Sequence, residues 1–436
     1  MTNEKPMAEY LKRATTPPAV ADREVQETVT AMLLDIERRG MDAVCEHSER
    51  LDGWDARRFR VGEDELRAAE RQVSEELRAH IAFAQQQVRG FAEHQRGTLS
   101  ELSVETLPGV TLGHRLIPVD AVGAYVPGGR YPMLASSFMT VIVAKVAGVG
   151  RVVACAPPRG STGIHPTMLY AMATSGADEI VCLGGVQALA AMAFGIEGLP
   201  PVDMIVGAGN AYVAEAKRQL FGRVGIDLLA GPTEVLVLAD ETADPELVAA
   251  DLLGQAEHGP TSAAVLVSTS RELARAAIEA VERLLATTWP TAEVAGEAWR
   301  SCGEVLVVDD DDAMIALANE IASEHVEVQV AEGKLDDYLA RLRNYGSLFL
   351  GSRATVAYGD KAIGTNHVLP TMRAARYTGG LWVGKFLKTV TFQRLTDEGT
   401  RHVAPAVAAI CDAEQFGGHA QTALMRLERL AAQAPA

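Results

Sequence analysis

The feature that most constrains this chain is a change of periodicity that recurs from about residue 110 onward. Short apolar runs, such as RVVACAPP (151–158) and VDMIVGAGN (202–210), are each followed by a stretch with helical spacing. Strands of a parallel sheet are buried on both faces and joined by crossover helices, so they produce this alternation. A second series begins at EVLVLAD (234–240) and includes HVEVQV (325–330). The sequence therefore predicts an α/β protein with two Rossmann-like domains built on parallel sheets.

The segments outside this alternation have helical spacing. Residues 20 to 100 place apolar side chains three and four positions apart, and the residues from about 400 onward read as helices joined by a Gly-Gly turn. We expect the tail, which has few apolar residues for a core, to pack on another subunit. The predicted parts are an N-terminal arm (1–22), a first α/β domain with the N-terminal helices (23–123 plus 235–380), a second Rossmann-like domain (124–234) and a helical tail (381–436).

The charge balance narrows the class of partner. The chain has 57 acidic and 40 basic residues, a formal net charge of −17, whereas nucleic acids and anionic membranes bind clustered Lys and Arg. The longest apolar stretch, from Met133, reaches Lys145 before it can span a bilayer, and the N-terminus lacks the apolar core of a signal peptide. We therefore expect a cytoplasmic protein that acts on a small molecule, with neither nucleic acid nor membrane as partner.

Three glycine clusters follow predicted strands: VPGG (126–129), LGG (183–185) and GAGN (207–210). Open α/β sheets bind ligands at the carboxyl ends of their strands. None of the clusters is a complete G-x-G-x-x-G or phosphate-binding loop, so each by itself can be a tight turn. Their recurrence favours a crevice for a nucleotide or a substrate.

Two pairs of polar residues have competing explanations. Gln255 and His258 share one face where a helix ends at QAEHGP; they can be metal ligands or an ordinary helix C-terminus. Glu324 and His325 are adjacent at a strand entry, SEHVEV, where neighbouring side chains point to opposite faces unless the backbone bends. This second pair can be an exposed strand start, or a base beside a group that activates water.

The segment YGDKAIGTNHVLPT (358–371) has neither helical nor strand spacing, and it places Asp360, Asn366 and His367 in a glycine-broken stretch. Such polar density predicts a site loop. His419, which follows two glycines, adds another imidazole near the C-terminus. Zinc accepts imidazole and carboxylate ligands, and a catalytic zinc keeps one position open for substrate.

Several blocks together resemble the histidinol dehydrogenase family, and they occur in that family's order from about residue 20 to 430. The blocks are GAYVPGG, GGVQALAAMAFG, GAGNAYVAEAKR, AGPTEVLVLAD, DLLGQAEHGP, ASEHVEV, GDKAIGTNHVLPT and EQFGGHA. The resemblance implies one zinc ion per subunit, bound by Gln255, His258, Asp360 and His419. It also implies NAD in the domain of residues 124–234, with Tyr125, Gln187 and Asn210 at the cofactor positions.

The same resemblance implies a homodimer with shared active sites, in which the tail of one subunit brings Glu414 and His419 to its partner's site. The implied reaction is a four-electron oxidation of a primary alcohol through an aldehyde to a carboxylate, with two NAD molecules in succession. His325 takes the alcohol proton and Glu324 activates water. The residues expected to contact substrate are Thr233, Gln255, His258, His325, Asp360, His367, Glu414 and His419.

The substrate side departs from the histidine-pathway enzymes. Lys361 follows the aspartate of the GD motif where they usually have tyrosine, and MRAARYTGGLWVGKFLK adds Arg373, Arg376 and Lys385. FGRVGID, GDKA and YTGGL are similar to the branch of the family that oxidises 2,3-dihydroxypropane-1-sulfonate, and a sulfonate pairs naturally with Lys or Arg. The alternatives are that these cations are solvated or pair with the surplus acids, that the substrate is L-histidinol, or that the chain is a catalytically silent binding relative.

Overall fold

The computed structural model describes residues 8–15, 23–128 and 131–433. These residues form two compact units. The first comprises the described residues up to Gln95 together with Val119–Lys385, and the second comprises Arg96–Pro118 and the described residues from Phe386 onward. Within the described ranges, no helix is long and apolar enough to cross a membrane.

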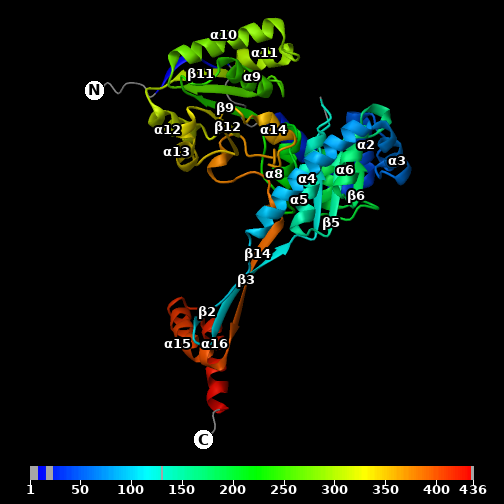
Figure 1. Cartoon of the computed structure of the whole chain (residues 1–436). Coiled ribbons are helices and arrows are strands. Elements are labelled where there is room, and N and C mark those ends of the chain that lie inside the picture. The colour runs from blue at the N-terminus through cyan, green and yellow to red at the C-terminus, as the bar shows by residue number, and fades with distance from the viewer. Residues whose placement is uncertain (1–7, 16–22, 129–130, 434–436) are drawn as a thin grey trace. The chain divides into compact units, whose positions relative to one another are not determined.

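The first unit contains a sheet of five parallel strands in the order β6-β5-β4-β7-β8. Two of these strands, β5 and β6, are labelled in Figure 1. This order reverses between β4 and β7, as it does in a doubly wound sheet. The strands are β4 (Ala121–Tyr125), β5 (Arg151–Ala156), β6 (Glu179–Cys182), β7 (Met204–Val206) and β8 (Gly225–Ile226). The helices of this series are α5 (Leu134–Ala147), α6 (Pro166–Ser175), α7 (Gly185–Phe194) and α8 (Ala211–Leu220).

A second sheet in the same unit repeats the order, because β11-β10-β9-β12-β13 are parallel strands arranged like those of the first. β1 (Glu9–Lys12) adds an antiparallel edge beside β11. The parallel strands are β9 (Glu234–Ala239), β10 (Ala263–Ser268), β11 (Gly303–Val307), β12 (His325–Gln329) and β13 (Ser347–Leu350). The prediction of an α/β fold with two Rossmann-like parallel sheets is confirmed.

The second sheet has helices on both faces (Figure 1). Each face carries an apolar core. One core forms with α9 (Pro245–Ala256), α10 (Arg271–Thr287) and α11 (Ala292–Cys302), and the other with α12 (Asp311–Ile321) and α13 (Leu335–Arg341). The short helix α14 (Val356–Lys361) follows β13. α9 begins at Asp244, whose carboxylate accepts from Glu246 N, with Pro245 at the first helical position.

The N-terminal helices are amphipathic, and they cover helices of the first sheet. α1 (Arg23–Arg39) packs on α7 and α8, α2 (Met41–Asp52) on α7, and α3 (Glu63–Gln72) on α6. α4 (Glu75–Gly97) completes this region. The predicted division grouped these helices with residues 235–380, whereas the structure packs them on helices of the first sheet. The reason is that an apolar stripe shows that a helix packs against another surface, but not which surface that is.

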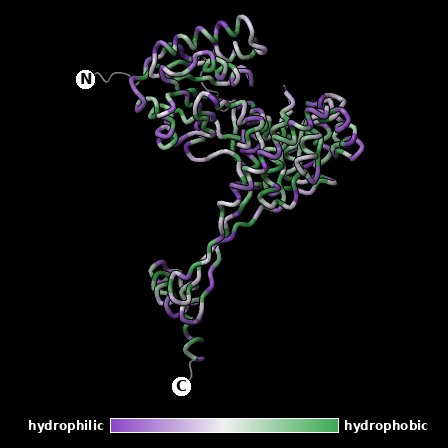
Figure 2. The backbone as a smooth tube through the Cα atoms, in the orientation of Figure 1, coloured by the Kyte–Doolittle hydropathy of each residue, from purple (hydrophilic) through white to green (hydrophobic). Residues whose placement is uncertain are grey.

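The second unit consists of a three-stranded antiparallel sheet and two helices. The sheet order is β14-β3-β2, with β2 (Leu102–Leu107), β3 (Val110–Pro118) and β14 (Leu387–Leu395). The tail is helical from α15 (Asp397–Ala413) through α16 (Gly417–Ala432), as predicted, whereas its earlier part is a strand. The buried cluster of these helices is small, comprising Ala408, Cys411 and Ala420. Hydrophobic and hydrophilic residues both occur along its strands (Figure 2).

Candidate active site

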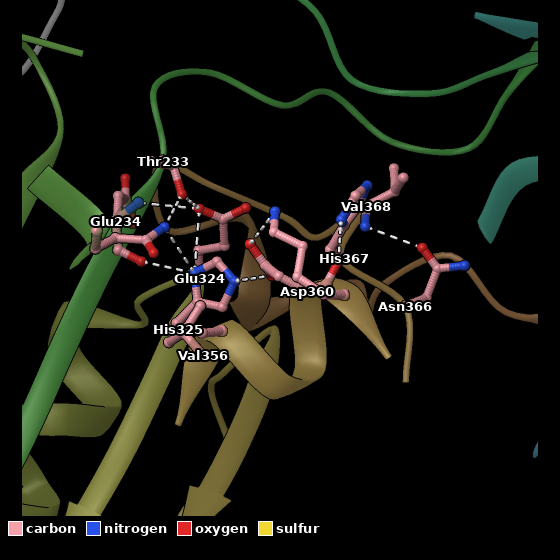
Figure 3. A network of polar contacts seen from close by, with 12 residues as sticks. Thr233, Glu234, Glu324, His325, Val356, Asp360, Asn366, His367 and Val368 are labelled. Carbon is pink, nitrogen blue, oxygen red and sulfur yellow. Dashed lines mark hydrogen bonds and ion pairs between the residues drawn. The ribbon is translucent and has the colours of Figure 1, made fainter. Parts of the chain in front are cut away.

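A group of polar side chains gathers at the amino ends of β9 and β12 (Figure 3). Thr233 precedes β9, Glu324 precedes β12, and His325 is the first residue of β12. The two strands are hydrogen-bonded neighbours, with His325 paired to Val235. Both members of the Glu324–His325 pair are buried, at 5% and 2% exposure, so they are not an exposed strand start.

The backbone bends at Glu324, immediately before β12, and the side chains of the adjacent Glu324 and His325 approach each other. Ala322 adopts the left-handed conformation, with φ of 54°, where α12 ends. Oε2 of Glu324 then lies 3.5 Å from Nδ1 of His325. The condition under which neighbouring residues can act together at a strand entry is therefore met.

The Glu324 carboxylate is held by two hydrogen bonds to one oxygen. Oε2 accepts from Thr233 Oγ1 at 2.6 Å and from Glu234 N at 2.9 Å. Burial raises the pKa of Glu324 to about 7, although His325 and the two hydrogen bonds oppose the increase. A carboxylate with a pKa close to neutral can both accept and release a proton, as a general base requires.

The His325 ring has one nitrogen held and one nitrogen open. Nδ1 lies 3.0 Å from the Glu234 carbonyl oxygen, and Nε2 lies 3.6 Å from Oδ1 of Asp360. Nε2 is buried and has no hydrogen-bond partner among the described residues. Burial alone would lower the pKa of His325, but the carboxylates of Glu324 and Asp360 raise it to about 9.

Three of the four predicted zinc ligands belong to this neighbourhood. Gln255, near the end of α9, donates to Thr233 Oγ1, and its Nε2 lies 3.4 Å from His325 Nδ1. Burial favours the protonated form of Asp360, but the imidazole of His325, whose Nε2 lies 3.6 Å from Oδ1, holds the pKa of Asp360 well below the usual range. His258 is exposed as a whole residue, but its imidazole ring is surrounded by protein atoms. This desolvation lowers the pKa of His258, although the nearby Asp360 charge acts in the opposite direction.

These donors fit a zinc ion chemically. An amide oxygen, a neutral imidazole and an ionised carboxylate are suitable ligands, and the unpartnered nitrogen of His325 lies beside the carboxylate. No group of three His, Cys, Asp or Glu residues is arranged to hold a metal in the part of the chain that the structure describes. Among the four predicted zinc ligands, His258 and Asp360 are the two of these residue types in the first unit. Gln255 is an amide, and His419 belongs to the second unit.

The loop after α14 connects the site to the first sheet. His367 Nε2 lies 2.7 Å from Ser136 Oγ, and its Nδ1 lies 3.0 Å from the Asp360 carbonyl oxygen. Asn366 donates to the Met139 carbonyl at 2.8 Å. Both ring nitrogens of His367 thus have protein partners, so a polar contact with substrate would have to displace one of them.

The cations noted in the sequence have different partners. Lys361 Nζ lies 3.9 Å from Asp360 Oδ2 and Lys385 donates to Thr378 Oγ1 at 2.8 Å. Arg373 is exposed and lies in a left-handed conformation, with φ of 64°. The preceding Met372 N donates to Glu234 Oε1 at 2.8 Å, which ties this loop to the start of β9. Arg376 is also exposed and donates to the Arg373 carbonyl.

The predicted cofactor residues lie at the carboxyl ends of the first sheet. Tyr125 ends β4, and its hydroxyl accepts from Gly185 N at 3.2 Å. Asn210 caps α8 by accepting from Val213 N at 3.1 Å, so it also has a structural role. A β-carbon at Gly207 would lie 2.1 Å from the Tyr125 carbonyl oxygen, so glycine at this position lets the ends of β4 and β7 approach each other closely. Gly129 of the VPGG cluster lies outside the described residues.

The buried side chain of Gln187 has a partner that the sequence did not indicate. Its Nε2 donates to Asp52 Oδ2 at 2.8 Å, while its Oε1 is buried without a hydrogen-bond partner in the described structure. Asp52 and Ser136 are single polar residues in helices, and neither has a local signal that would have identified it.

The two predicted site residues of the tail lie in the second unit, and both are exposed. Glu414 caps the end of α15. His419 stands near the start of α16, where its ring contacts that of Phe416 edge-on at 5.4 Å. Their contribution to a shared site stays a prediction.

Comparison with known proteins places this arrangement in context. The family model described as histidinol dehydrogenase matches residues 16–427. A histidinol dehydrogenase homolog of Shouchella clausii is 51% identical over 97% of this chain and 99% of its own length. A sulfopropanediol 3-dehydrogenase of Ruegeria pomeroyi is 48% identical over 97% of this chain and 96% of its own length. The crystal structure of histidinol dehydrogenase from Elizabethkingia anophelis matches with a TM-score of 0.90 at 34% identity, covering 96% of this chain and 95% of that one.

Proposed function

Since the chain belongs to the histidinol dehydrogenase family and is therefore an oxidoreductase, we propose that it is a zinc- and NAD-dependent dehydrogenase that oxidises a primary alcohol to a carboxylate. The observation that carries the proposal is the buried Glu324–His325 pair, in which one ring nitrogen is held and the other is open. Each of two successive oxidations transfers a hydride to one NAD. One water supplies the second carboxylate oxygen, and three protons are released.

In this proposal the neutral form of His325 removes the hydroxyl proton of the alcohol. Because the pKa of His325 is raised to about 9, this form is the minor one at neutral pH. The Glu234 carbonyl holds Nδ1 at 3.0 Å and so fixes which nitrogen faces substrate. Asp360, 3.6 Å from Nε2, and Glu324, 3.5 Å from Nδ1, stabilise the imidazolium that forms. The nearby carboxylates thereby favour the product of this proton transfer.

Glu324 then removes a proton from the water that attacks the aldehyde. Both of its hydrogen bonds among the described residues go to Oε2, which leaves Oε1 to accept from water. Thr233 and the Glu234 backbone orient the carboxylate, and burial keeps its pKa close to neutral pH.

Gln255, His258 and Asp360, together with His419 from the partner subunit of a homodimer, would hold the zinc ion. When bound, zinc orients the substrate and polarises its oxygen. The dimer is supported by the second unit, whose small buried cluster contrasts with its exposed apolar side chains. These include Leu102, Val104, Leu107, Leu112, Val390, Phe392, Ile410 and Phe416.

For the substrate, we favour a small anionic diol such as 2,3-dihydroxypropane-1-sulfonate over L-histidinol. Lys361 lies next to the Asp360 carboxylate, and Arg373 lies on the loop tied to Glu234. These cations would attract a sulfonate and repel the cationic histidinol. A relative that is 48% identical is named for sulfopropanediol, which agrees with this preference.

Steady-state NADH production with both alcohols, alongside measurement of bound zinc, tests the proposal. We expect turnover of the sulfonate with one zinc per subunit. Efficient turnover of histidinol with none of the sulfonate would favour histidine biosynthesis. Zinc and dinucleotide binding without turnover of any alcohol in a wide panel would indicate a silent binding relative.

A further inference from the structure

Asp52 occupies a position that is unfavourable for a carboxylate on structural grounds alone. It is the last residue of α2, where the helix dipole is negative, and it is half-buried. The hydrogen bond that its side chain makes is to the neutral amide of Gln187 at 2.8 Å. Residues that break local rules without a compensating partner tend to mark functional sites.

The packing of α2 on α7 brings Asp52 to the carboxyl ends of the first sheet. A β-carbon at Gly184, just after β6, would lie 3.0 Å from Asp52 Oδ2 and 3.0 Å from Pro157 Cβ. A β-carbon at Gly128, just after β4, would lie 3.1 Å from Pro157 Cγ. The carboxylate thus adjoins a surface of glycine and proline, at the edge where doubly wound sheets bind dinucleotides.

Two polar groups at this edge point to a ligand. Gln187 is 1% exposed, and its Oε1 has no hydrogen-bond partner among the described residues. The Tyr125 hydroxyl accepts from Gly185 N, two residues before Gln187, so two of the three predicted cofactor residues adjoin the same turn. A buried amide oxygen without a donor is costly, and a hydroxyl-bearing ligand would supply one.

We propose that Asp52 accepts hydrogen bonds from the adenosine ribose of the dinucleotide and makes the site selective for NAD over NADP. This rests on the proposed NAD dependence. The nicotinamide has to reach His325 at the other sheet. The half of the dinucleotide that would lie above the end of β6 is therefore the adenosine half, and its ribose is the one next to Asp52. NADP carries a phosphate on that ribose, which the carboxylate repels. In other Rossmann folds an acidic residue from within the sheet has this role; here a helix outside it supplies the group.

The test measures the affinity of the purified protein for NADH and for NADPH by fluorescence titration, without alcohol. We expect the unmodified protein to prefer NADH, and Asp52→Asn to lose on the order of tenfold or more of that preference, the effect of a charged hydrogen bond. Glu49→Gln is the matched control, because it removes the same charge from an exposed position on α2. It should leave both affinities unchanged.

Asp52→Ser keeps a hydrogen-bonding group and removes the charge, and it should behave like Asp52→Asn. Thermal unfolding of each variant establishes that it is folded. An unchanged NADH-to-NADPH ratio in a folded Asp52 variant, or a preference of the unmodified protein for NADPH, would overturn the assignment to Asp52 while leaving the dehydrogenase intact. Failure of the unmodified protein to bind either dinucleotide would instead overturn the proposed NAD dependence.

Discussion

The hydroxyl of Ser136 and the Nε2 atom of His367 lie 2.7 Å apart, although 231 positions separate the two residues in the sequence. Ser136 belongs to α5, which follows β4 at the carboxyl edge of the first sheet. His367 adjoins the polar group at the amino edge of the second sheet. The edge expected to bind cofactor in one sheet is thus joined to the edge expected to carry the chemistry in the other.

Removing this connection should weaken both the fold and the reaction. Ser136→Ala leaves Nε2 of His367 without its partner, at a cost of about 1–3 kcal/mol in the free energy of unfolding. Urea unfolding and kcat/KM check this. Ser137→Ala is the control, because that buried hydroxyl, within the described part of the chain, donates only to the Leu134 carbonyl of its own helix. Equal effects of the two variants would show that the connection has no special role.

The two members of the Glu324–His325 pair should affect different steps. Glu324→Gln should slow the oxidation of the aldehyde more than that of the alcohol, because water attacks only in the second half. His325→Ala should slow alcohol oxidation by about 10²–10⁴, the usual contribution of a general base. Single-turnover measurements that start from the alcohol or from the aldehyde separate the steps. Equal losses on both substrates in both variants would contradict the division of roles.

Zinc should be required for turnover more than for folding, because both parallel sheets have apolar cores that do not depend on it. Chelation should abolish NADH production with little change in circular dichroism. Full activity after verified removal of zinc would rule out the metal's role.

His258→Ala and His419→Ala should each lose zinc. If the site is shared, dimers that carry one substitution in each chain should recover one intact site of two. Recovery of no activity in such mixed dimers, with both single variants inactive, would place all ligands in one chain.

A buried acid pair below the site should make stability depend on pH. Asp251 accepts from Gln329 at 2.7 Å and from Thr355 at 2.9 Å, and Glu327 accepts from Val356 N at 2.8 Å. Burial and the neighbouring Asp251 raise the pKa of Glu327 well above its ordinary value. The folded protein therefore keeps a proton that the unfolded chain releases, so this group's contribution to stability falls as pH rises from about 4.3, the ordinary pKa, toward the folded value.

Glu327→Gln is neutral at every pH and can still donate to Asp251. Relative to the unmodified protein, its free energy of unfolding should therefore increase between pH 5 and pH 8, by about 0.5 kcal/mol for a pKa shift of one unit and by about 1.5 kcal/mol or more if the shift reaches two units. Denaturant titrations at the two values measure this. Glu320→Gln, which removes an exposed carboxylate from α12, should show no such trend. A constant difference between Glu327→Gln and the unmodified protein would mean that Glu327 is ionised in the fold.

We expect substrate choice to depend on the cations beside the site. Lys361→Met should lower kcat/KM for the sulfonate about tenfold or more, the effect of losing a charged hydrogen bond, and should not lower that for histidinol. Arg373→Met tests the second cation in the same way. Lys388→Met, which removes an exposed charge from β14, is the control. Loss of activity on both alcohols in Lys361→Met would assign that residue to holding Asp360 rather than to substrate.

The two sheets were predictable because strands buried on both faces leave continuous apolar runs. The packing of helices around the two sheets was less predictable. Gln187 lies 135 positions from Asp52, and contacts of this kind depend on how whole helices pack rather than on local spacing. The amphipathic pattern of α1 likewise does not show which sheet it covers. The sequence singles out Glu324 and His325 as a pair, but only the structure shows the bend at Glu324 where the two side chains approach each other.

The position of the polar group at the amino ends of β9 and β12 has a practical consequence. Glu241, which follows β9 at its other end, is exposed. Glu241 lies seven positions after Glu234, which corresponds to about 20 Å at the rise of a β-strand. A cysteine introduced there could carry a fluorophore or a surface tether rigidly coupled to the strand that bears Glu234, yet remote from the entering alcohol. Once the protein is immobilised in this way, solutions of metal, dinucleotide and alcohol can be passed over it one after another.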